Sequence, residues 1–189
     1  MHLALIAAVG ALAATPSEEA PAPTHRQNML LLEPEPGGIA VAYTRALSES
    51  WAVTAAVGVN ANISETLGSV GTVSTNLGFG LDLGLTRYLV SRAPAGPWLR
   101  MRVGSSYQRF TLTTPTVPGV EPLQGQGYTL RGAALIGFTA ILEPGFTIQL
   151  AAGPEVLRHF QQIDQPAGLA ASMVWNLHAR TELGVGWSF

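Results

Sequence analysis

Strict alternation between large apolar residues and small or polar ones runs through most of this chain, and it limits the possible folds more than any other feature. In WAVTAAVGVNANI (51–63) the odd positions are apolar, and in TNLGFGLDLGLTRYL (75–89) Leu and Phe alternate with Gly, Asn, Asp and Thr. Because successive side chains of a β-strand point to opposite faces of the sheet, a period of two predicts strands with one large apolar face. Similar strands fit 39–47, 98–111, 127–142 and 146–158.

The composition of the smaller face separates a soluble sheet from a membrane barrel. A solvated face carries Lys, Glu, Arg and Thr, whereas this one is mostly Gly, Ala, Ser, Thr and Asn. Charged residues make up only 12% of the chain, against about a quarter in a typical soluble domain. Small residues suit the narrow lumen of a small barrel, which leaves the large apolar face to meet lipid. No segment has the 18 consecutive apolar residues of a transmembrane helix, and strands can satisfy their backbone polar groups in lipid only as a closed barrel.

The connections between these strands alternate between short and long. Outer-membrane barrels have short periplasmic turns and longer extracellular loops, so we expect the short set on the periplasmic side. Trp51, Trp98 and Phe146 each open a strand after a short connection, where an interfacial aromatic girdle belongs. The short connections are 48–50, 91–97 and 143–145, and the long ones are 64–74, 112–126 and 159–168.

The number of strands depends on the two ends of the chain. The strand 39–47 needs an outward-running partner before it, and QNMLLLE (27–33), joined to it through PEPGG, is the candidate. Reading NLHA as a turn would give nine strands. The residues from Trp175 to Phe189 keep one phase through NLHA, however, which favours one long strand starting near Ser172. The sequence therefore predicts an all-β fold, an eight-stranded antiparallel up-and-down transmembrane β-barrel with both termini in the periplasm.

The N-terminal residues have the features of an export signal. Leu3 to Leu12 form an apolar run too short to span a bilayer, followed by small residues and a polar, Pro-containing stretch. We expect a signal peptide over 1–14, a flexible leader over 15–26 and the barrel domain over 27–189.

Few residues are candidates for chemistry. The chain has no Cys, no metal-ligand spacing and no phosphate-binding glycine motif, so no cofactor or metal is expected, and a formal net charge of −2 does not favour nucleic-acid binding. Charged residues on the smaller face could form an ion path, a substrate site or a paired network that closes the lumen. The narrow interior of eight strands favours the network. Arg45, on the apolar face beside a turn, would snorkel to the headgroups. The lumen candidates are Asp82, Arg100, Arg102, Arg131, Glu155, His178, Arg180 and Glu182.

Two stretches carry a resemblance to a known group. GIAVAYTRALSESWAV resembles the strand, tight periplasmic turn and strand unit of small eight-stranded outer-membrane proteins of the OmpA and OmpX type. LGVGWSF, with Trp187 and Phe189, resembles the C-terminal signal that the barrel-assembly machinery reads. The resemblance implies a monomer in the bacterial outer membrane, in contact with membrane lipid and lipopolysaccharide.

This resemblance implies architecture more than function, because such barrels have many roles. We expect a structural or surface-interaction role through the extracellular loops, with a narrow pore as the alternative. A lipid-A-modifying enzyme is the less favoured alternative, because it needs a Ser, His and carboxylate set. His178, His159, Ser172 and Glu155 could lie near one another, but no compact motif joins them, so no enzyme is expected.

Overall fold

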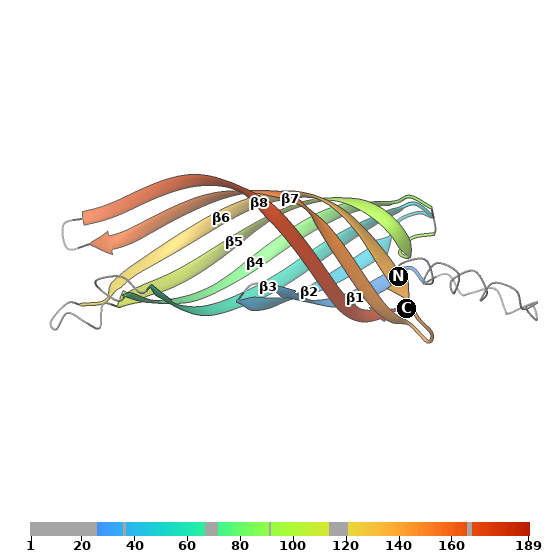
Figure 1. Ribbon diagram of the computed structural model, residues 1–189, viewed down its shortest axis with the longest axis horizontal. Helices are drawn as coiled ribbons and strands as arrows, with labels where there is room; N and C mark the ends of the chain where they lie inside the picture. The colour runs from blue at the N-terminus through green and yellow to red at the C-terminus, as the bar shows by residue number, and fades with distance from the viewer. Residues whose placement is uncertain (1–25, 36, 67–71, 91, 114–120, 166–167) are drawn as a thin grey trace, which may run out of the picture.

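Eight antiparallel strands close into a barrel in the computed structural model of this chain, which describes residues 26–189 except 36, 67–71, 91, 114–120 and 166–167. Each strand pairs with its neighbours in sequence, and β8 closes the barrel against β1 (Figure 1). The all-β fold and the number of strands are therefore confirmed. The predicted signal peptide, 1–14, and the leader, apart from Arg26, lie outside the described residues. The strands are β1 (Asn28–Glu35), β2 (Gly38–Ala46), β3 (Trp51–Thr66), β4 (Thr72–Tyr88), β5 (Gly96–Thr113), β6 (Leu123–Ile141), β7 (Phe146–Gln165) and β8 (Gly168–Ser188).

The C-terminal segment forms one strand, as its unbroken phase predicted. β8 pairs with β7 without a gap from Gly168 to Trp187, straight through NLHA. The backbone N–H of Asn28 donates to the carbonyl oxygen of Phe189 at 3.0 Å, so β1 begins at the end of the barrel where β8 finishes. The nine-strand alternative is thereby removed.

The bounds predicted for the long connections are too wide. Residues 64–66, 72–74, 112–113, 123–126, 159–165 and 168 belong to strands, and the ladders continue to Thr66↔Thr72, Leu112↔Leu123 and Gln165↔Gly168. Polar and Pro-containing sequence suggested loops, but Thr and Gln also pair well across strands. The Gln126 side chain, for example, donates to Gln162 Oε1 at 3.0 Å. The strands at this end therefore extend well past the range of the apolar alternation.

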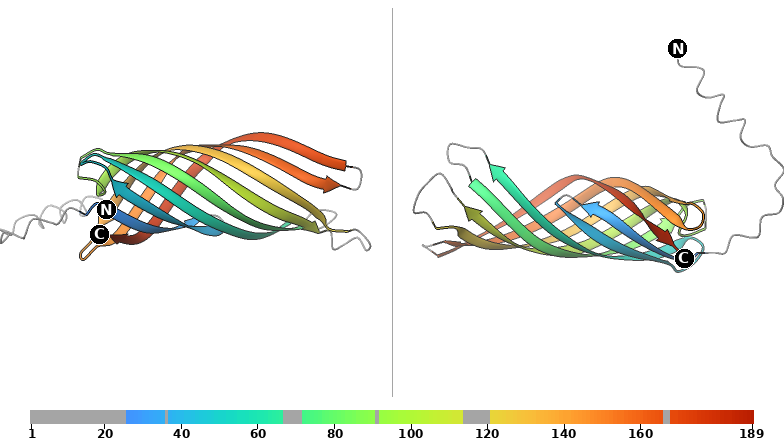
Figure 2. Two further views of the ribbon diagram at one scale, coloured as in Figure 1. Left: turned by 180° about the vertical axis from the view of Figure 1, so that it is seen from behind. Right: turned by 90° about the horizontal axis from the view of Figure 1, so that it is seen from below.

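The barrel wall is uneven in height. The β1–β2 hairpin turns early, at Gly37, whose φ of 76° lies in the left-handed region that favours glycine. β1 and β2 have 8 and 9 residues, whereas β7 and β8 have 20 and 21. Figure 2 shows the blue β1–β2 hairpin stopping partway along the barrel, while β7 and β8 continue. The β1–β8 ladder consequently covers only Met29–Leu32, whereas the β7–β8 ladder covers all of β7.

The two faces of the wall reverse the arrangement of a water-soluble protein, with apolar side chains outside and polar ones inside. Along β4 the outward residues are large, apolar and exposed, from Leu77 to Leu85, whereas Asp82 and Thr86 point inward and are buried. The lumen carries other buried polar side chains. At the end where β1 begins, it is filled instead by apolar side chains such as Met29 and Leu31. The predicted assignment of faces is therefore correct.

Trp98 is an exception to the predicted girdle. Trp51 and Phe146 point outward, 39% and 41% exposed, but Trp98 is completely buried in the lumen. Its indole N–H donates to Thr139 Oγ1 at 2.8 Å, and it packs with Tyr88 and alanines of neighbouring strands. Trp98 shares the phase of Arg100 and Arg102, so its position beside a turn misled the prediction. It closes this end of the lumen instead of facing outward.

Candidate functional site

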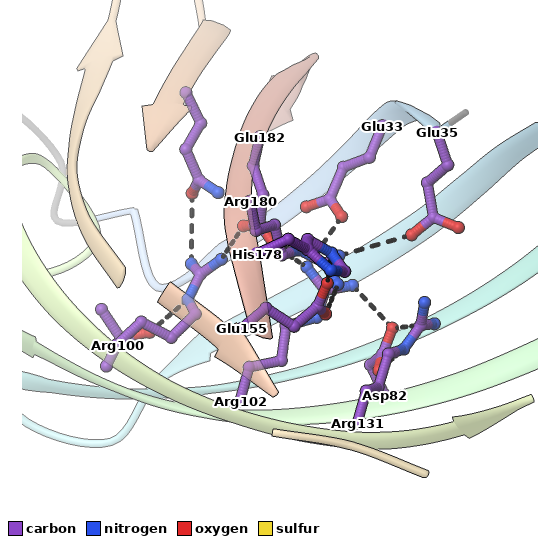
Figure 3. Close-up of polar contacts among 12 residues, drawn as sticks. Glu33, Glu35, Asp82, Arg100, Arg102, Arg131, Glu155, His178, Arg180 and Glu182 are labelled. Atoms are coloured by element: carbon purple, nitrogen blue, oxygen red, sulfur yellow. Dashed lines mark hydrogen bonds and ion pairs between the residues drawn. The ribbon is translucent and has the colours of Figure 1, made fainter. Parts of the chain in front are cut away.

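Ten charged or titratable side chains meet inside the barrel, and we call them the lumen cluster (Figure 3). They come from β1, β4, β5, β6, β7 and β8, so the cluster joins walls that are distant in sequence. All eight lumen candidates belong to it, and β1 adds Glu33 and Glu35, which sequence reasoning missed. The members are Glu33, Glu35, Asp82, Arg100, Arg102, Arg131, Glu155, His178, Arg180 and Glu182.

Arg102 lies at the centre of the lumen cluster. Its Nη2 donates to Asp82 Oδ2 at 3.0 Å, and its Nη1 donates to Glu33 Oε2 at 3.2 Å and to Glu182 Oε1 at 2.5 Å. All four residues are at most 7% exposed. One guanidinium therefore connects β1, β4, β5 and β8 across the lumen.

Asp82 is held from a second side by Arg131. The guanidinium of Arg131 donates from Nε to Oδ1 at 2.6 Å and from Nη2 to Oδ2 at 2.5 Å, a bidentate pair with defined geometry. Gly104 makes room for this carboxylate, because a Cβ at that position would overlap Asp82 Oδ1. Glycine is needed here for a close approach.

Arg100 forms the layer of the cluster nearest Trp98. Its Nε donates to Thr86 Oγ1 at 2.8 Å and its Nη2 to Gln149 Oε1 at 3.2 Å, while its Nη1 lies 3.5 Å from Glu182 Oε2. The guanidinium also stacks over the Trp98 ring, 4.3 Å from its centroid. This charge is held by neutral groups and an aromatic face as well as by a carboxylate.

Arg180 lies at the centre of the layer of the cluster that is farthest from Trp98. Its guanidinium contacts Glu155 Oε1 at 2.6 Å, Glu182 Oε1 at 2.8 Å and Glu35 Oε1 at 3.5 Å. His178 Nε2 lies 2.8 Å from Glu155 Oε2, and its side chain is 44% exposed. The solvent therefore reaches the cluster first at His178.

Glu33 and Glu35 were missed although the sequence carried a signal for them. Met29, Leu31 and Glu33 share one phase, opposite the outward Leu30 and Leu32. The candidate strand ended at Glu33, because Pro34 and Pro36 suggested a turn. The structure continues β1 to Glu35 and so places a second acid in the lumen.

The arrangement supports ion pairing more than bond-making chemistry. His178 faces Glu155, but Ser172 pairs with Gln161 and lies six residues from His178 along an extended strand, about 20 Å away. His159 Nδ1 lies 2.9 Å from Thr129 Oγ1 instead. The Ser, His and carboxylate set considered from the sequence is therefore not gathered in one place.

Two further features are absent from the part of the chain that the structure describes. No group of three or more Asp, Glu or His side chains is placed to hold a metal ion. No helix there has the length and apolar character to cross a membrane.

Comparisons with known proteins leave the geometry as the basis for a functional argument. No protein-family model matches the chain, and a search of curated proteins finds no match either. The outward face and the lumen cluster must therefore carry that argument.

Proposed function

We propose that this chain is an integral outer-membrane β-barrel with a closed lumen, and that it has a structural or surface-interaction role. The observation that carries the proposal is the inversion of the wall, with large apolar side chains outside and paired charges inside. A protein surrounded by water would bury those apolar side chains. Lipid around the barrel removes this conflict.

The height of the apolar surface supports a membrane position. On β5 the outward residues from Leu99 to Val103 are apolar and 47–65% exposed. The outward cation Arg87 is the cross-strand partner of Leu99, and Arg109 lies ten residues further along β5. For a tilted strand this separation corresponds to about 25 Å, the height of the lipid-facing band of outer-membrane barrels.

Amphipathic side chains at the end with the short turns support its assignment to the periplasmic interface. Trp51, Phe146 and Trp187 point outward there, beside Arg45 and Arg87. Arg87 stacks over Trp51, 5.7 Å from the ring centroid. Aromatic rings and snorkelling arginines suit a membrane interface. The resemblance to OmpA- and OmpX-type proteins, with Trp187 and Phe189 as the assembly signal, agrees with this orientation.

The lumen cluster favours a closed barrel over a pore. Arg102 contacts carboxylates of β1 and β8 from the opposite part of the wall, Arg180 pairs with carboxylates of the neighbouring strands β1 and β7, and Trp98 fills the end below them. Ion pairs that cross an interior just wide enough for side chains leave little room for a continuous water path. Any contact with partners would then use the strand ends beyond the apolar band, where Thr113, Gln124 and Gln161 belong to strands in ranges expected to be loops.

Insertion and conduction are tested separately. Protein refolded with phosphatidylcholine vesicles should float with them through a density gradient and should change its gel mobility on boiling. In a planar bilayer it should show no steady conductance. Failure to float would contradict the membrane proposal, whereas flotation with steady conductance would replace the closed barrel by the pore alternative.

A further inference from the structure

The outward face of β5–β8 carries a patch of arginines and aromatic side chains. It lies at the upper edge of the apolar band, which is the edge farther from the short turns. We propose that this patch binds a phosphorylated, acylated lipid of the surrounding leaflet, with an acyl chain in a hollow at Ser105 and separate phosphate groups at Arg109 and at Arg158. This inference rests on the proposed membrane location. It goes further because it assigns a ligand class to particular residues.

The hollow results from one small residue in a row of large ones. Across neighbouring strands the pairing runs Leu81↔Ser105, Ser105↔Leu130 and Leu130↔Arg158. Ser105 points outward where its neighbours along β5 are Val103 and Tyr107, and it leaves a space of about 430 Å³. Besides small polar residues such as Ser105, Ser106 and Thr129, the hollow is lined by Phe79, Leu81, Tyr107, Tyr128 and Leu130. Such a wall matches an alkyl chain in chemistry.

Aromatic side chains close the upper side of the hollow. The Tyr107 ring centroid lies 5.7 Å from that of Phe79 and 4.9 Å from that of Tyr128. The Tyr107 hydroxyl donates to Gln126 Oε1 at 3.3 Å and accepts from Arg109 Nε at 2.9 Å. The surface thus changes from apolar to hydrogen-bonding within two residues, as the boundary between acyl chains and headgroups does.

Arg109 presents its charge above the hollow. The bond from its Nε to Tyr107 orients the guanidinium without neutralising it, and leaves both terminal nitrogens for a ligand. No carboxylate pairs with Arg109 among the described residues. Phosphate oxygens are the anionic acceptors that suit this planar donor, especially at headgroup depth.

Arg158 flanks the hollow on the other side, next to Leu130. Its guanidinium carbon lies 4.8 Å from the Phe160 ring centroid and 5.0 Å from that of Trp175, and its Nη2 lies 2.9 Å from Met173 Sδ. These contacts fix the side chain but are all uncharged. Across the described ranges, Arg158 also has no carboxylate partner, in contrast to every arginine of the lumen cluster. Two uncompensated cations beside one apolar hollow complement an anionic lipid.

A second outward hollow, near Trp51, is less suited to this ligand. Small residues such as Ala134 and Ala152 create it, and its one outward cation is Arg87. The upper hollow therefore has the better match to a phosphate with an attached acyl chain.

The test compares lipids that differ only in phosphate. The folded protein in neutral detergent is incubated with lipid A or with the same lipid after removal of its phosphates, and bound lipid is measured by native mass spectrometry. We expect tighter binding of the phosphorylated form, and we expect Arg109→Gln/Arg158→Gln to weaken it by about tenfold or more. Arg45→Gln/Arg92→Gln removes the same charge at the opposite end and should bind like the unmodified protein.

Ser105→Leu should weaken binding by filling the hollow, whereas Val103→Leu, one outward position away, should not.

Each of these comparisons can overturn the proposal. Equal retention of the two lipids, or equal losses in both double-arginine variants, would remove the phosphate site. Undiminished binding in Ser105→Leu would remove the acyl site. If Arg109→Gln/Arg158→Gln does not fold, Arg109→Lys/Arg158→Lys keeps the charge and should retain most of the binding; loss of binding in a folded lysine variant would contradict a charge-based site. A protein that floats with vesicles but shows no phosphate preference would overturn this inference alone, while a protein that does not float would overturn the proposed function.

Discussion

Arg102 contributes to stability chiefly because three buried carboxylates depend on it. Arg102→Ala would leave Glu33, Asp82 and Glu182 facing one another with fewer cations among them. We expect the free energy of unfolding to fall by about 3–5 kcal/mol, as when one partner of a buried ion pair is removed. Urea unfolding in vesicles, followed by tryptophan fluorescence, measures this change.

The control for that variant is Arg92→Ala. Arg92 and Glu49 form an ion pair at 3.5 Å whose side chains are both more than 70% exposed. Its loss should change the free energy of unfolding by less than about 1 kcal/mol. An equal effect of the two variants would show that the lumen cluster adds little to stability.

Gly104 tests the packing of the same cluster without removing a charge. In Gly104→Ala the new methyl group would push Asp82 away from Arg102 and Arg131. We expect a loss of about 2 kcal/mol in the same unfolding measurement, typical of overpacking at a buried site. Gly132→Ala is matched, because nothing lies within 4 Å of a Cβ there. Equal stability of the two variants would mean that Asp82 has room to move.

Strand identity was predictable from the sequence, but strand length was not. In the strands that contain Trp51 and Leu77, each residue faces either the interior or the outside. Because this requirement is repeated at every second residue, it leaves an alternating pattern in the sequence. The ends of the strands depend on cross-strand partners such as Thr111 and Gln124, which only the folded register brings together. Trp98 shows the same limit, because a position beside a turn does not determine which face its side chain takes.

The extension of β7 and β8 can be tested by disulfide formation. Gln162, which lies in the predicted long connection 159–168, is the cross-strand partner of Ala171. Because the chain has no cysteine of its own, Gln162→Cys/Ala171→Cys should oxidise readily and give one crosslinked species on a non-reducing gel. Gln162→Cys/Ser172→Cys, which places the second thiol on the opposite face, should crosslink poorly. Equal crosslinking in the two variants would indicate a loop without fixed register.

The molecule as a whole is held together in two different ways. Backbone ladders join neighbouring strands around the wall, and the lumen cluster joins strands across the interior. The inversion of faces was predictable, because it is repeated along every strand. Eight of the ten cluster members were predicted, but their pairing was not, since the pairing of Asp82 with Arg131 or of Glu155 with Arg180 depends on barrel closure. Glu33 contacts Arg102 across a separation of 69 residues, which no local pattern could indicate.

The short β1–β8 ladder gives the barrel one weak joint, and it connects the segments most distant in sequence. Closing a long loop has the larger entropic penalty, so the β7–β8 hairpin should form early and the β1–β8 joint late. The same joint should open first in the folded state, because few backbone bonds hold it. Hydrogen exchange should therefore replace amide protons faster in Met29–Leu32 than in Phe146–Leu150, and Glu33→Gln should accelerate exchange in β1 while leaving β7 nearly unchanged. Uniform protection of the two strands would mean that the wall opens as one unit. If β1 is the strand that exchanges first, the barrel opens and closes at the single junction between β1 and β8, and Glu33 is the residue that keeps this junction closed.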